Sequence, residues 1–150
     1  LNSGAYHASV AKHMKGNKSS TQIHGSTMTI VKPDWIIELK GSKGIRDAII
    51  NIELDMGTEP IETLAQKVFK YALLAEKNRD KLHIMDIVIA DNSFSNRTTL
   101  SNGIGRTENI VKRFNADSAV INRAKESGLK IIVRPLRHNV KAVYEALRKN

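Results

Sequence analysis

The sequence predicts an α/β domain in which helices flank a single mixed β-sheet. Two observations lead to this fold class. Short runs rich in apolar and β-branched residues dominate positions 23–56, and after them helical spacing alternates with further apolar runs. A set of strands followed by alternating helices and strands is typical of one mixed sheet covered by helices. The 150 residues, 41% of them hydrophobic, are enough for one such domain.

The first half of the chain predicts an arm followed by the strands of a hairpin. Residues 1–22 are polar, basic and rich in Gly and Ser, so they are expected to be a flexible basic arm or linker before a domain spanning 23–150. A short strand is expected over 23–31, because this segment is rich in β-branched residues. The next strand, 33–41, starts at a proline, where a missing N–H does least harm. A Gly-Ser-Lys-Gly turn then leads into a returning strand over 45–56.

The second half predicts three helices that alternate with two apolar strands. Thr58 is expected to cap the first helix, which ends near Asn78. A second helix is expected to start at Arg106 or Thr107, with Thr107 as its N-cap, and to run to Glu126 before Gly128 stops it. The remaining elements are a strand over 82–90, a polar loop over 91–105, a strand over 129–136 and a final helix over 139–150.

The balance of charge points to a polyanionic partner. Lys and Arg number 24 against 15 Asp and Glu, which gives a net charge of +9. DNA or RNA is favoured over a membrane surface, because no basic amphipathic anchor and no run of roughly 18 apolar residues is present. The absence of cysteine excludes disulfides and thiolate metal sites and suits the cytoplasm. A second interpretation stays open, in which the surplus Lys simply keeps the surface soluble.

Three carboxylates are expected to meet at one end of the predicted hairpin. Asp34 starts one strand, and Glu53 and Asp55 lie near the end of its partner. Antiparallel pairing brings the start of one strand beside the end of the next, and residues two apart point to the same face. Three such acids suit a hard cation such as Mg²⁺ or Mn²⁺. Taken singly, each acid is better explained as a strand terminator or a solvated side chain than as a functional residue.

The following helix is expected to complete a site for phosphodiester hydrolysis. Lys67 lies on this helix within reach of the acids, and Tyr71 lies one turn further along the same face. A metal ion polarises a phosphoryl oxygen and activates water, while an ammonium stabilises the developing charge.

These residues carry a resemblance to known families. The core pattern of an acid, x, Asp, x, Gly-Thr-Glu, then a helix with Lys and Tyr four apart, resembles the replication-relaxation family of plasmids and mobile elements over about residues 30 to 90. The matching positions are Glu53, Asp55, Gly57, Thr58, Glu59, Lys67 and Tyr71. Pro33 and Asp34, followed by Glu53, resemble the PD-(D/E)xK nucleases. This second resemblance implies a restriction-endonuclease-like mixed sheet flanked by helices.

One departure from the nuclease pattern leaves two functions open. The pattern has Lys two residues after its acid, where this chain has Asp55. One hypothesis is a DNA-binding domain of a plasmid or mobile-element replication or relaxation protein. The alternative is a magnesium-dependent endonuclease or nickase that uses Asp34, Glu53, Asp55 and Lys67, with Tyr71 and Glu59 in support. A third hypothesis, contact with other replication or conjugation proteins, predicts no salt-dependent DNA binding.

The sequence also predicts roles for several residues outside this cluster. Arg134, Arg137 and Lys141 are expected to form a basic patch facing DNA, although lone surface charges are usually only solvated. Trp35, next to Pro33, is expected in the core. The five histidines lack metal-ligand spacing, and His83, which opens an apolar strand, is expected to be structural.

Overall fold

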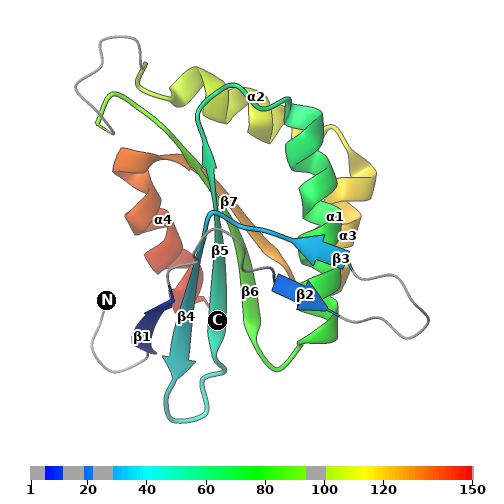
Figure 1. The fold of residues 1–150 in the computed structure, drawn as a ribbon, viewed down its shortest axis with the longest axis vertical. Coiled ribbons are helices and arrows are strands. Elements are labelled where there is room, and N and C mark those ends of the chain that lie inside the picture. Colours follow the sequence, from blue (N-terminus) through cyan, green and yellow to red (C-terminus); the bar gives the residue numbers. More distant parts are fainter. Residues whose placement is uncertain (1–5, 12–18, 22–28, 94–100, 150) are drawn as a thin grey trace.

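The computed structural model describes residues 6–11, 19–21, 29–93 and 101–149. Its centre is a five-stranded mixed sheet in the order β1-β4-β5-β6-β7, which confirms the predicted fold class (Figure 1). Strands β1 and β4, and β4 and β5, pair antiparallel, whereas β5, β6 and β7 pair parallel. The strand bounds are β1 Tyr6–Ala11, β2 Ser19–Thr21, β3 Thr29–Val31, β4 Trp35–Gly41, β5 Ala48–Asp55, β6 Leu82–Ile89 and β7 Lys130–Pro135.

Four helices cover the two faces of the sheet. They are α1 Ile61–Lys77, α2 Ile104–Asn115, α3 Ser118–Ser127 and α4 Leu136–Arg148. Helices α1, α2 and α3 lie on one face and α4 on the other (Figure 1). Every residue of β6 is buried, as expected for a strand covered on both faces. Among the described residues, no helix is both long and apolar enough to cross a membrane.

Successive side chains of β5 and β6 point to opposite faces of the sheet, and this alternation divides the core into two layers. Met85, Ile87 and Ile89 of β6 pack against α1, α2 and α3, whereas Ile84 packs toward α4. The same two-residue period in β5 sends Ile50 to the α4 side. The acids at positions 53 and 55 therefore face α1, on the other side of the sheet.

The predicted hairpin is confirmed. Strands β4 and β5 pair with Trp35 opposite Ile52 and Leu39 opposite Ala48. In the turn, Lys43 and Gly44 have φ angles of 51° and 84°, a left-handed conformation that glycine adopts without strain. The Asp47 carboxylate closes the turn by accepting the Gly41 N–H at 2.9 Å.

The start of α1 differs from its prediction. The helix begins at Ile61 with Pro60 in the N-cap position, and no side chain caps it, so the expected Thr58 cap is wrong. Proline fits here because its fixed φ suits the entry to a helix and its missing N–H removes one donor that would lack a partner. The helix ends at Lys77, with Asn78 as C-cap, as predicted.

The single helix expected from 106 to 126 is wrong, because the structure has α2 and α3 in its place. Asp117 interrupts the run by accepting the N–H groups of Ala119 and Val120 at 3.0 and 3.3 Å, so it caps a new helix. Thr107 is not an N-cap either. It lies inside α2, where its hydroxyl donates to the Gly103 carbonyl at 2.7 Å.

Two segments at the start of the chain also differ from expectation. Within the expected flexible arm, β1 pairs with β4 at the edge of the main sheet, and β2 pairs with β3 in a small second sheet. The expected strand over 23–31 is described only as β3, since residues 23–28 lie outside the described part of the chain. Trp35 is 40% exposed rather than in the core, because α4 packs on β6 and β7 and leaves its part of β4 open.

Candidate functional site

The buried carboxylate of Glu53 is the centre of the candidate site. Glu53 lies near the end of β5 and is 5% exposed. The Tyr71 hydroxyl donates to its Oε1, and the Lys67 ammonium donates to its Oε2 at 2.9 Å. Because Lys67 and Tyr71 are four residues apart on α1, one helix face supplies both donors. The structure thus brings together Glu53, Lys67 and Tyr71, as the sequence predicts.

The electrostatics of this trio keep Tyr71 protonated and Lys67 charged. Burial raises the pKa of Glu53, although the hydrogen bonds from Tyr71 and Lys67 oppose this rise. Burial and the nearby Glu53 charge also raise the pKa of Tyr71 strongly, so its hydroxyl stays a donor. Burial alone would lower the pKa of Lys67, but its hydrogen bonds to Glu53 and Glu59 outweigh that effect and leave it raised.

Glu59 is the second acid bound to Lys67. Its carboxylate lies 2.9 Å from the ammonium, which therefore bridges two carboxylates. The Gly-Thr-Glu turn places Glu59 there: Gly57 has a φ of 82°, and its N–H donates to the Asp55 carboxylate at 3.1 Å. The turn thus folds back on β5 and carries Glu59 over the start of α1.

Asp55 is bound by a different cation. Arg106, in the first turn of α2, donates from Nε to Asp55 Oδ2 at 2.7 Å and from Nη2 to Oδ1 at 3.1 Å. The same Nη2 donates to the Glu59 carbonyl at 2.5 Å. The sequence did not predict this role for Arg106, because the residue lies 51 positions from Asp55 in the chain.

Asp34 contacts the backbone of the hairpin rather than a cation. Its carboxylate accepts the Leu54 N–H at 2.8 Å, and its own N–H donates to the Ile52 carbonyl at 2.9 Å. Asp34 is exposed, and its charge contributes to raising the pKa of Glu53. It therefore lies at the predicted end of the sheet.

The arrangement of these acids has a consequence for metal binding. Lys67, Tyr71 and Arg106 donate to the oxygens of Glu53 and Asp55. Across the described ranges, no group of three or more Asp, Glu, His or Cys side chains is placed to hold a metal ion. The predicted acids thus share one end of the sheet, but Glu53 and Asp55 are paired with different cations and the Asp34 carboxylate accepts a backbone N–H.

The residues predicted to face DNA lie on the α4 side of the sheet. Arg134 lines a groove between β7 and α4, and Lys141 is exposed on α4. Arg137 is held instead by Asp91, whose buried carboxylate lies 3.3 Å from Nε of the guanidinium, and by Asn92. All three cations are exposed, but Arg137 is paired with an acid and joins the start of α4 to the segment just after β6.

Comparison with known proteins gives one match. A family model described as Replication-relaxation matches residues 7–85, more than half of the chain. This range includes β1, the hairpin, the Gly-Thr-Glu turn, and the helix that carries Lys67 and Tyr71. No curated protein and no solved structure matches.

Proposed function

The chain belongs to the replication-relaxation family, and on this premise we propose that it is a DNA-binding domain acting in the replication or relaxation of plasmid or mobile-element DNA. The observation that carries the proposal is the net charge of +9. The cations of the candidate site, Lys67 and Arg106, are already paired with its acids, so the surplus cations lie elsewhere on the molecule. Surplus Lys and Arg bind phosphates and release condensed counterions.

The test is the salt dependence of binding to a labelled DNA duplex. Fluorescence anisotropy should show an affinity that falls steeply between about 50 and about 200 mM salt, because each phosphate contact releases a counterion. Glu53→Gln is a suitable control, since it changes the candidate site and should leave this dependence intact. No binding at low salt would refute the proposed function.

We propose as a second candidate that the domain is an endonuclease or nickase with a restriction-endonuclease-like core. The observation that favours it is the 2.9 Å contact between the Lys67 ammonium and Glu53. A nuclease of this kind needs an ammonium beside its acid, and Lys67 supplies one from α1 although Asp55 replaces the expected Lys in the strand.

The metal expected for this candidate, Mg²⁺ or Mn²⁺, does not fit the site as it is arranged. Such an ion needs several carboxylate oxygens directed at one point, whereas Lys67 and Arg106 bind those of Glu53 and Asp55. The exposed carboxylate of Asp34 is the best placed of the three for an ion from solvent. The second candidate therefore requires Lys67 or Arg106 to leave its carboxylate when DNA binds.

A plasmid nicking assay separates the two candidates. Supercoiled plasmid is incubated with wild type, Glu53→Ala and Lys67→Ala in Mg²⁺ and in Mn²⁺, and relaxed circles are measured. Nicking by wild type that both variants lose would establish the second candidate. Binding without nicking would leave the first, and nicking that both variants retain would exclude this site as its source.

We further propose that the domain works in the cytoplasm beside other replication or conjugation proteins. The support is family membership alone. Co-purification of such proteins with the tagged protein from a plasmid-bearing host, and not from a plasmid-free host, is the expected result.

A further inference from the structure

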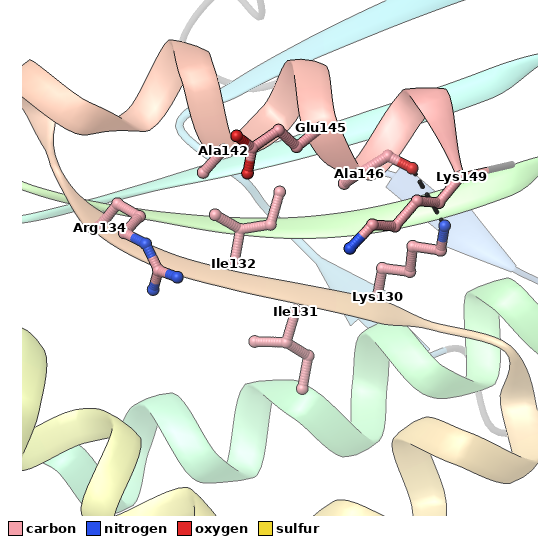
Figure 2. Close-up of a pocket in the computed structure, with 8 residues that line it drawn as sticks. All are labelled: Lys130, Ile131, Ile132, Arg134, Ala142, Glu145, Ala146 and Lys149. Carbon is pink, nitrogen blue, oxygen red and sulfur yellow. Dashed lines mark hydrogen bonds between the residues drawn. The ribbon is translucent and has the colours of Figure 1, made fainter.

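A groove of about 370 Å³ runs between the edge strand β7 and helix α4 (Figure 2). Its residues are Lys130, Ile131, Ile132, Arg134, Ala142, Glu145, Ala146 and Lys149. The cationic side chains of this set outnumber its single carboxylate by three to one. The groove therefore concentrates positive charge, and it lies on the face of the sheet opposite Glu53.

The cations of the groove crowd one another. Burial lowers the pKa of Lys130, and the positive charges of Arg46 and Lys149 lower it further. No carboxylate forms an ion pair with Lys130 or Lys149 in the part of the chain that the structure describes. An anion bound among these groups would relieve their mutual repulsion, and the adjacent low-dielectric surface would strengthen its attraction.

The directions of the side chains suit an extended anion rather than a single small one. Lys130 is fixed at one end of the groove, where its ammonium donates to the Ala146 carbonyl of α4 at 3.1 Å. Lys149 extends along the groove from the end of α4, and Arg134 lies at the opposite end (Figure 2). Arg134 donates from Nη1 to the Val133 carbonyl at 2.7 Å, which leaves most of its N–H donors for another acceptor.

The spacing of residues along β7 sets the distance between the two charged ends of the groove. Lys130 and Arg134 are four residues apart on one strand, which separates their Cα atoms by about 13 Å. Both side chains lie on the α4 face, because four is an even number of strand residues. Ile132 lies between them on the same face and gives the floor of the groove an apolar surface. Two charged ends separated by an apolar floor suit two non-adjacent phosphates along one strand of a nucleic acid.

We infer that this groove binds the phosphodiester backbone of DNA through Lys130, Arg134 and Lys149. The inference rests on the proposed function and adds the place on the molecule where the DNA lies. Because the groove and Glu53 are on opposite faces of the sheet, DNA binding in the groove is separable from any chemistry at Glu53.

The test compares two variants that lose the same charge. Arg134→Ala with Lys149→Ala removes two groove cations and keeps Lys130, whose contact with Ala146 holds the end of α4. Lys112→Ala with Lys125→Ala removes two exposed cations from α2 and α3 on the other face. Affinity for a labelled duplex should fall at least about tenfold in the groove variant, and its salt slope should decrease by about 2. The matched variant should change much less.

A third variant tests the sign of the effect. Glu145→Gln removes the one carboxylate of the groove and should tighten DNA binding severalfold. Urea unfolding of each variant identifies any loss that comes from misfolding. Equal losses of affinity in the groove and matched variants, or no tighter binding by Glu145→Gln, would refute the groove as the DNA-binding site. Either result would leave the proposal that the protein binds DNA intact. If wild type itself fails to bind DNA, the proposed function fails first.

Discussion

Arg106 and Asp55 are 51 positions apart in the chain, yet two hydrogen bonds join them in an ion pair at the end of β5. The Asp55 side chain is fully buried and that of Arg106 is 21% exposed. This pair ties α2 to the strand that carries Glu53. It therefore fixes the second half of the domain against the first.

Replacing Arg106 with Ala should destabilise the protein by about 3 kcal/mol, because it leaves the buried Asp55 charge without its cation. Urea unfolding monitored by circular dichroism measures the change. The double variant Arg106→Ala with Asp55→Asn should lose less than the sum of the single losses, since removing the charge removes the penalty. Strictly additive losses would show that the pair is not coupled.

Replacing Tyr71 with Phe tests the hydrogen bond to Glu53. The ring stays in the core, but the buried Glu53 loses a donor, so unfolding free energy should fall by roughly 2 kcal/mol. The pKa of Glu53 should rise further, because one of the hydrogen bonds that lowers it is gone. Tyr144→Phe on α4 is a control for the loss of a hydroxyl at a half-buried position. Equal effects in the two variants would argue against a special role for Tyr71.

Asp86 should make the stability of the fold decrease as pH rises. It is buried in β6 with the Asn139 amide as a donor, and burial raises its pKa from 3.8 to about 6. Between these two values the folded protein binds more protons than the unfolded chain, so this group's contribution to stability falls as pH rises. A shift of about 2 pKa units corresponds to at most about 3 kcal/mol.

The variant Asp86→Asn should remove this dependence. Relative to wild type, it should gain stability as pH rises from about 4 to 6 and keep the gain at pH 8. Urea unfolding at a series of pH values measures the difference. Parallel profiles for the two proteins would show that Asp86 ionises in the fold as easily as in the unfolded chain.

His83 should have the opposite effect on stability from Asp86, making the fold less stable as pH falls. Its ring is buried, neither nitrogen meets the geometric criteria for a hydrogen bond to any described residue, and burial lowers its pKa below 6.5. The unfolded chain therefore binds the proton more readily, so stability is lost as pH falls from 6.5 through the folded pKa. His83→Phe keeps a ring without its nitrogens and should abolish this acid sensitivity while being at least as stable at pH 7. A variant that stays as acid-sensitive as wild type would contradict the prediction.

Short-range patterns in the chain are enough to predict the local geometry of the candidate site. The two-residue period of the β5 segment puts Glu53 and Asp55 on one face, and the turn chemistry at Gly44 allows a hairpin that carries Asp34 to the same end. The helical period likewise places Lys67 and Tyr71 on one side of α1. Each of these relationships depends on residues that are close in the chain, so a pattern in the sequence is enough to predict it.

Other charge pairs depend on the packing of segments that are far apart in the chain. Arg106 reaches Asp55 and Arg137 reaches Asp91 because α2 and α4 pack where they do. The same packing brings Lys130 and Lys149 together from a strand and a helix. Contacts between distant segments depend on how whole faces of helices and strands fit together, and no local spacing encodes that fit. The sequence therefore predicts the acids of the site and Lys67 beside them, but only the packing of the helices shows that Arg106 neutralises Asp55.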